Sequence, residues 1–154
     1  MMTEELTLPD AAATRRLGAA LAAGIAPGRV LFLHGDLGAG KTTLVQGLLR
    51  ALGFAGRVKS PTYSLVELYE LSSLNLYHFD FYRFTDRSEW EASGFRDYFT
   101  PATACIVEWP ERAGGLLAAP DLEVSLAFAG SGRSARLRPR SLPGREWLAA
   151  ALRR

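Results

Sequence analysis

Hydrophobic residues in the first third of the chain follow two different patterns. Residues 29–35, RVLFLHG, form a short continuous apolar run, which is typical of a strand buried on both faces. Residues 9–24 and 41–52 instead place Ala, Leu and Val at helical spacing, and Pro9 and Asp10 supply a start signal for the first of them. The pattern therefore predicts helix, strand, loop and helix over the first sixty residues.

The middle of the chain is rich in residues that favour strands. Residues 63–71 and 75–84 are two such runs joined by a short polar link, and they predict an antiparallel hairpin. Residues 86–95 predict a short helix that begins near an aspartate cap. Residues 103–109, TACIVEW, predict another buried strand.

The last third of the chain adds a hairpin and a helix. Residues 110–120 predict a loop or a broken helix, and residues 144–154 predict a closing helix. Residues 121–130 and 134–140 predict two strands that pair around Gly-Ser-Gly. We therefore expect an α/β fold with a mixed, mainly parallel central sheet, flanking helices, and antiparallel hairpins at the edges.

Length and composition narrow the class of protein. The 154 residues are enough for one sizeable core, so we expect a single domain over residues 1–154. Cys105 is the one cysteine, which excludes a disulfide framework or a cysteine metal cluster within this chain. The N-terminal segment lacks the pattern of a secretory leader, and no run approaches the roughly 18 apolar residues of a membrane span. We expect a cytoplasmic protein with no membrane partner.

Charge is unevenly placed although the net charge is only +2. Residues 130–154 contain seven arginines and one acid, Glu146. This segment is either a surface for RNA or an acidic partner, or a solvated strand and helix face. No aromatic residue interleaves with the arginines at 133–140, which favours the solvated face.

Residues 34–44, HGDLGAGKTTL, carry the strongest motif. Gly35, Gly40, Lys41 and Thr42 match G-x-x-x-x-G-K-[ST], between a predicted buried strand and the first turn of a predicted helix. Glycines in such a loop permit backbone angles closed to other residues, so that consecutive N–H groups form a cradle for phosphate oxygens. The helix N-terminus adds partial positive charge. The motif predicts a P-loop NTPase domain.

The residues after the last glycine of the motif have distinct expected roles. Lys41 is expected to bridge the β- and γ-phosphates, and the Thr42 hydroxyl to ligate Mg²⁺. Thr43 offers a further hydroxyl or N–H group. Guanine recognition usually needs an Asn-Lys-x-Asp loop, whereas the only asparagine, Asn75, is followed by Leu, so we expect ATP as the nucleotide.

Two acids end apolar runs, Asp80 in LYHFD and Glu108 in CIVE. An acid at the end of a buried strand beside the loop strand reaches the metal or its waters in this class of fold. We expect Glu108 to contact the metal and Asp80 to position water or the γ-phosphate. The alternative for either is a carboxylate exposed to solvent at a strand end. His78 shares a strand face with Asp80 and is expected to be structural rather than catalytic.

Five segments together resemble the TsaE family, also called YjeE, of bacterial ATPases needed to form threonylcarbamoyladenosine in tRNA. In order along the chain, they are GDLGAGKTT at 35–43, KSPTYSLVE at 59–67, YHFDFYR at 77–83, GFRDYF at 94–99 and VEWPE at 107–111. Many proteins share the first segment, and the other four make the resemblance specific. Beyond Gly114 little resembles the family except Gly132 and Arg133.

The resemblance implies a set of site residues. ATP and Mg²⁺ are expected at the loop residues Asp36, Leu37, Gly38, Ala39, Gly40, Lys41, Thr42 and Thr43, with Asp80 and Glu108 as acidic partners. Ser60, Pro61 and Thr62 would form a switch-like loop that senses the γ-phosphate, although a Thr at the start of a strand is the alternative for Thr62. Trp109 would lie near the site or pack in the core. The adenine side would be lined by Pro9, Asp10 and Arg133.

The resemblance also implies partners. In this family TsaB and TsaD transfer the threonylcarbamoyl group onto the adenosine 3′ to the anticodon in tRNAs that read codons beginning with A. A TsaE protein docks on the TsaB–TsaD assembly, and its ATP cycle resets that assembly between turnovers. Contact with tRNA would be indirect, through that complex.

Weak intrinsic hydrolysis is expected, because no motif places an arginine on the γ-phosphate, and such a residue supplies a factor of about a thousand or more. Arg83 in the same chain, or an arginine of a partner, is a candidate for that role. Two alternatives stay open: a nucleotide-dependent scaffold without essential turnover, and a small-molecule kinase. For a kinase lid the available arginines are Arg87, Arg96 and Arg112, which no motif marks.

Overall fold

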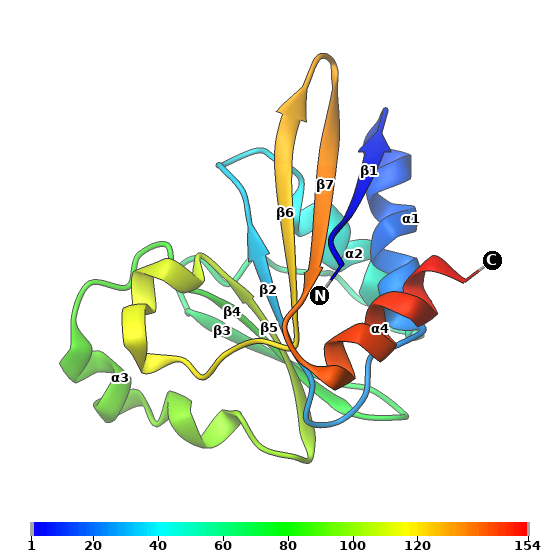
Figure 1. The fold of residues 1–154 in the computed structure, drawn as a ribbon. Helices are drawn as coiled ribbons and strands as arrows, with labels where there is room; N and C mark the ends of the chain where they lie inside the picture. The colour runs from blue at the N-terminus through cyan, green and yellow to red at the C-terminus, as the bar shows by residue number, and fades with distance from the viewer. Residues whose placement is uncertain (1, 154) are drawn as a thin grey trace.

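The structure, a computed structural model, describes residues 2–153 and is built around a seven-stranded sheet (Figure 1). The strands are β1 (Glu4–Leu8), β2 (Val30–His34), β3 (Val66–Glu70), β4 (Asn75–Asp80), β5 (Thr103–Glu108), β6 (Leu122–Ala129) and β7 (Gly132–Pro139). The helices are α1 (Ala11–Ala22), α2 (Lys41–Ala51), α3 (Arg87–Ser93) and α4 (Leu142–Leu152), with 3₁₀ segments η1 (Phe95–Tyr98) and η2 (Pro110–Leu116).

The strand order is β1-β7-β6-β2-β5-β4-β3. The four central strands, β6, β2, β5 and β4, are parallel to one another. The β3–β4, β6–β7 and β1–β7 pairs are antiparallel. The predicted fold, a mixed α/β sheet with a parallel centre and antiparallel hairpins at its edges, is confirmed.

Helices cover both faces of the sheet, and each face has its own core. α1, α2 and α4 pack on one face through mainly aliphatic residues, among them Leu31 and Ile106 (Figure 1). α3, η1 and η2 cover the other face, where aromatic residues such as Phe79 and Phe81 pack, with ring centroids 5.5 Å apart. Since side chains alternate along a strand, His78 and Asp80, which flank Phe79 on β4, face α2 instead.

Two glycines bring α1 and α2 into backbone contact. A Cβ atom on Gly18 would lie 1.9 Å from the Leu44 carbonyl oxygen, and one on Gly47 would lie 2.0 Å from the Arg15 carbonyl oxygen. Both distances are far inside van der Waals contact, so only glycine fits at either position. This contact fixes α2, and hence the loop before it, against α1.

The sequence-based prediction missed one strand and misplaced several ends. β1 was not predicted, because its alternating pattern is only five residues long, yet it pairs with β7 along its whole length. The first hairpin is shorter than predicted, since β3 begins at Val66 and β4 ends at Asp80. α4 begins earlier, because Ser141 caps it by accepting a hydrogen bond from the Gly144 N–H at 3.0 Å.

Candidate nucleotide site

The loop between β2 and α2 has the backbone shape that its glycines predict. Gly38 has φ +82° and Gly40 has φ +110°, both in the left-handed region that favours glycine. The Ala39 N–H donates to the Asp36 carbonyl at 3.0 Å, which folds the loop back on itself, while Leu37 is largely exposed. No side chain within residues 2–153 caps α2. The first-turn N–H groups, including that of Thr42, therefore suit an external anion.

Lys41 begins α2 and is almost fully buried. Its Nζ donates to the Gly35 carbonyl and lies 4.0 Å from the centroid of the Trp109 ring. Burial lowers the pKa of Lys41, and the charges of Glu108 and Asp80 oppose that shift. The lysine thus sits in a site where the nearby fixed charge is negative.

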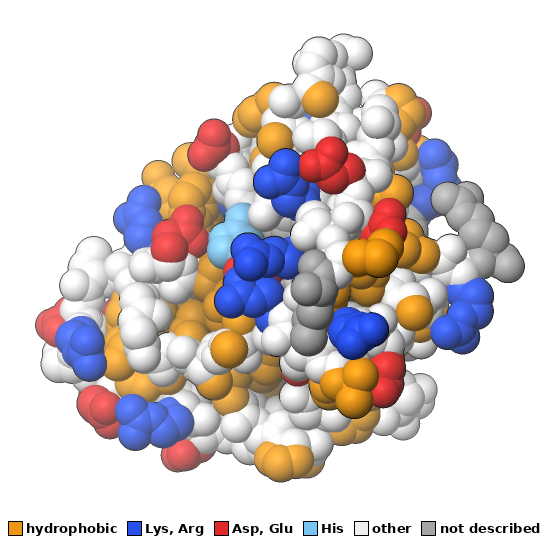
Figure 2. All heavy atoms as spheres, in the orientation of Figure 1, with side chains coloured by type: hydrophobic (Ala, Val, Ile, Leu, Met, Phe, Trp, Pro, Cys, Tyr) orange, Lys and Arg blue, Asp and Glu red, His pale blue; other side chains and the backbone are white. Residues whose placement is uncertain are grey.

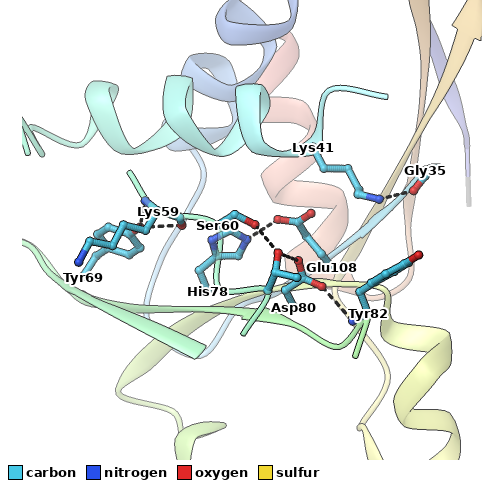
Figure 3. A network of polar contacts seen from close by, with 10 residues as sticks. Gly35, Lys41, Lys59, Ser60, Tyr69, His78, Asp80, Tyr82 and Glu108 are labelled. Atoms are coloured by element: carbon cyan, nitrogen blue, oxygen red, sulfur yellow. Dashed lines mark hydrogen bonds and ion pairs between the residues drawn. The ribbon is translucent and has the colours of Figure 1, made fainter. Parts of the chain in front are cut away.

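The two predicted acids lie side by side at the carboxyl ends of β4 and β5. Asp80 and Glu108 are register neighbours, on the sheet face that α2 covers, and are 4% and 2% exposed (Figure 3). The alternative that these carboxylates are exposed to solvent is therefore wrong. Burial raises the pKa of Asp80, and Glu108 adds to that rise, whereas the Tyr82 N–H, which donates to Oδ1 at 2.9 Å, lowers it. Two buried acids against one lysine suit an added divalent cation with oxygen ligands.

The segment before β3 is linked to these acids. Thr62 lies in a turn rather than at the start of a strand, so the strand-start alternative is wrong. Its Oγ1 donates to Asp80 Oδ2 at 3.4 Å and lies 2.9 Å from Ser60 Oγ. The Asp80 N–H in turn donates to the Leu65 carbonyl at 3.0 Å. A movement of the Asp80 carboxylate would therefore displace Thr62 directly, and Ser60 through Thr62.

Backbone strain is found on both sides of the acids. Among residues 2–153, Leu65 with φ +70° and Trp109 with φ +54° are the only residues other than glycine with positive φ. Leu65 joins the turn of Thr62 to β3, and Trp109 directly follows Glu108. Such conformations persist where the surrounding structure enforces them, and they cluster at functional sites. The strain agrees with a functional role for the site.

A small pocket of about 160 Å³ opens beside the loop, and neither Asp80 nor Glu108 is among its lining residues. It is lined by Asp10, Ala11, Thr14, Gly38, Gly40, Thr43, Ser131, Gly132 and Arg133. The structure thus brings Asp10 and Arg133, which the resemblance assigned to the adenine side, together beside the loop. Pro9 does not line the pocket, and its backbone instead packs against Gly132.

Arg133 connects the β6–β7 hairpin to the loop. Its Nη2 donates to the Gly38 carbonyl at 3.0 Å, and its guanidinium lies 4.4 Å from the centroid of the Phe128 ring. Its buried Nε has no hydrogen-bond partner among the described residues. A donor without a partner beside a pocket at a phosphate loop fits an acceptor supplied by a bound ligand.

Sequence reasoning missed some residues around the site. Thr14 and Ser131 line the pocket, but the first resembles any residue on a buried helix face and the second any turn residue. Arg83, the arginine of this chain considered for the γ-phosphate, lies over the Tyr63 ring at 4.4 Å. Arg112, one of the three arginines considered for a kinase lid, lies 5.5 Å from the Trp109 ring.

The arginines near the C-terminus are spread among acids. Arg136 pairs with Glu5 and Arg140 with Glu123, each at 2.8 Å. On the face shown in Figure 2, basic side chains are interspersed with acidic ones. This arrangement supports the solvated-face interpretation of the arginine-rich segment.

Over residues 2–153 the helices are too short or too polar to cross a membrane.

Comparison with known proteins gives a consistent result. The family model described as "Threonylcarbamoyl adenosine biosynthesis protein TsaE" matches residues 8–136. The chain is 45% identical to the Haemophilus influenzae tRNA threonylcarbamoyladenosine biosynthesis protein TsaE over 108 residues, covering 70% of this chain and 68% of that protein. It is 39% identical to the Bacillus subtilis protein of the same name over 117 residues, covering 76% and 73% of the two chains.

A solved structure agrees with these sequence matches. The crystal structure of Bacillus subtilis YdiB superposes with a TM-score of 0.82 at 27% identity, and the match covers 97% of this chain and 94% of that one. The family model spans all the elements that build the loop, the acids and most of the β6–β7 hairpin. The chain therefore belongs to the TsaE family of tRNA threonylcarbamoyladenosine biosynthesis proteins.

Proposed function

We propose that the protein binds Mg²⁺–ATP at the loop between β2 and α2, hydrolyses it slowly, and uses the cycle to support threonylcarbamoylation of tRNA by a TsaB–TsaD complex. The observation that carries the proposal is the buried position of Lys41 between a glycine loop and the acids Asp80 and Glu108. A lone buried cation beside two buried acids is a poor way to stabilise a core, but it suits a polyphosphate with a divalent cation.

The proposed role of each residue follows from its position in the site. The loop N–H groups and Lys41 would hold the β- and γ-phosphates, and Thr42 and Glu108 would hold Mg²⁺. Bound Mg²⁺ would offset the negative charge of the triphosphate. Asp80, which already accepts from Thr62 and Tyr82, would orient the attacking water. Asp10 and Arg133 would flank the nucleoside beside the pocket.

Slow turnover by the isolated chain is part of the proposal. The guanidinium of Arg83 is stacked on Tyr63, which is 82% exposed, so this arginine is engaged at the surface. A stabilising group for the γ-phosphate would then come from a docked partner. Residues 60–62, of which Thr62 contacts Asp80 and Ser60 contacts Thr62, would report the state of the nucleotide to that partner.

Replacement of Glu108 by Gln tests whether turnover is needed. We expect Glu108→Gln to retain ATP binding and to lose both hydrolysis and formation of threonylcarbamoyladenosine in a reconstituted reaction with TsaB, TsaD, tRNA and the threonylcarbamoyl donor. The control is Glu70→Gln, at an exposed acid that ends β3, and it should behave as wild type. Full modification by Glu108→Gln without hydrolysis would instead support the scaffold alternative.

A further inference from the structure

His78 is a buried polar residue that the proposed function does not use. It lies on β4 two residues before Asp80, on the sheet face covered by α2, and its side chain is 0% exposed. Its Nε2 lies 2.6 Å from Glu108 Oε2, the shortest of the contacts around the two acids. A histidine needed only to fill the core would gain nothing from facing a buried carboxylate.

The contact fixes which nitrogen carries the proton. An ionised carboxylate only accepts hydrogen bonds, so Nε2–H is the donor to Glu108. Nδ1 has no hydrogen-bond partner within residues 2–153, and a bare lone pair there is less costly than an N–H group left unsatisfied. The tautomer that carries its proton on Nε2 satisfies both conditions. The imidazole is thus aimed at Glu108 alone.

Figure 3 shows the imidazole and Lys41 on opposite sides of the Glu108 carboxylate in that view. The hydrogen bond to Oε2 restrains the side chain, and Oε1, which this bond does not use, keeps its lone pairs for a ligand. A glutamate without this restraint would lose rotamer entropy when it bound a cation. Outer partners of this kind orient carboxylate ligands and raise metal affinity.

We propose that His78 is a positioning residue, which holds Glu108 through Nε2–H so that the free carboxylate oxygen is presented to the Mg²⁺ of the bound nucleotide. This inference rests on the proposed function, because it assumes that Mg²⁺–ATP binds at the loop. It assigns His78 no contact with nucleotide and no part in proton transfer.

The test is a titration of ATP binding with MgCl₂, followed by calorimetry, on the full chain. His78→Leu keeps a similar volume without a donor, and we expect it to raise the Mg²⁺ concentration for half-maximal binding about 10–100-fold. ATP affinity in EDTA should stay as in wild type. His78→Gln, which places an amide donor near Glu108, should recover most of the Mg²⁺ affinity.

A second comparison separates positioning from general damage to the fold. In a Glu108→Gln background, His78→Leu should cause no further change in Mg²⁺ dependence, because the carboxylate it orients is gone. If His78→Leu does not fold, His78→Asn replaces it, since its amide is too short to reach Glu108. An unchanged Mg²⁺ requirement, or an equal loss in the Glu108→Gln background, overturns the inference. Absence of Mg²⁺-dependent ATP binding by the wild-type chain would instead overturn the proposed function itself.

Discussion

Asp80 shows at the scale of one residue that the site is organised for a ligand and not for stability. Its carboxylate is buried beside Glu108, and both burial and that neighbour raise its pKa above the usual value of 3.8. The Tyr82 N–H and Thr62 hydroxyl oppose the shift without cancelling it. The ionised form is therefore less favoured in the folded protein than in the unfolded chain.

This shift predicts how stability depends on pH. A raised pKa means that the folded protein binds more protons than the unfolded chain, so its unfolding free energy falls as pH rises from about 3.8 to the folded pKa. Asp80→Asn cannot ionise. We expect this variant to have a higher melting temperature than wild type at neutral pH without nucleotide. The increase should be roughly 2–4 °C for each kcal/mol of unfavourable charge burial that the substitution removes.

The advantage of Asp80→Asn should shrink as pH falls through that window. The measurement is thermal unfolding in EDTA at a series of pH values. Asp97→Asn, at an exposed position on η1, is the control and should track wild type. A lower melting temperature for Asp80→Asn at neutral pH would contradict the electrostatic account of Asp80.

Individual site residues differed in how far the sequence could predict them. Lys41 and the loop glycines were predictable because their spacing is imposed by the phosphate-binding backbone. Asp80 and Glu108 were predictable because acids rarely end buried strands by chance. The partner of His78 was not, because the contact between His78 and Glu108 joins two strands that lie far apart along the chain. A strand pattern gives the face of a residue but not its neighbour on the next strand.

At the scale of elements, the position of the phosphate loop depends on the contact between α1 and α2. Gly47 faces the α1 backbone at a distance that admits no Cβ. We expect Gly47→Ala to destabilise the protein by about 1–3 kcal/mol, because the helices must move apart. The measurement is unfolding in urea.

The matched control is Gly115→Ala, where a Cβ would meet nothing within 4 Å. We expect it to change stability little. Because α2 carries Lys41 and Thr42, Gly47→Ala should also weaken ATP binding, although Gly47 itself does not line the pocket. Wild-type stability for Gly47→Ala would refute the tight packing of α1 on α2.

The β6–β7 hairpin contributes through Arg133. Because Arg133 donates to the Gly38 carbonyl and lines the pocket, Arg133→Ala should weaken ATP binding about tenfold, the loss expected for a charged hydrogen-bonding group. Arg138→Ala, an exposed arginine on the opposite face of β7, is the control and should bind ATP as wild type. Equal affinities for the two variants would exclude Arg133 from the site. Calorimetry with ATP measures both.

Elements with long, distinct patterns were predicted best. α1 and α2 combine apolar spacing with a cap or a glycine, β5 is a continuous apolar run, and the observed positions of all three agree with the sequence. β1 was missed because five alternating residues at a chain end are a weak signal, and its place depends on pairing with the distant β7. The first hairpin was predicted too long, because residues 63–65 and 81–84 contain mostly aromatic and apolar side chains, which are typical of strands, but lie in turns next to the strands.

For the whole molecule, the fold places one functional edge at the carboxyl ends of the parallel strands. Loop, acids and the turn at Thr62 meet there, because β2, β4 and β5 run in the same direction. Ligands bind at this edge in open α/β sheets. Membership of the TsaE family assigns the chain to tRNA threonylcarbamoyladenosine biosynthesis, and the nucleotide cycle proposed above is argued from the geometry of this edge.

The most direct test of this account is steady-state ATP hydrolysis by the purified chain, alone and with TsaB and TsaD. Lys41→Ala is the blank, and Lys59→Ala, the only other lysine and an exposed one, is the control. We expect faint turnover alone, a several-fold rise with the partners, and none with Lys41→Ala. Turnover that is unaffected by the partners, or that survives Lys41→Ala, would contradict the account.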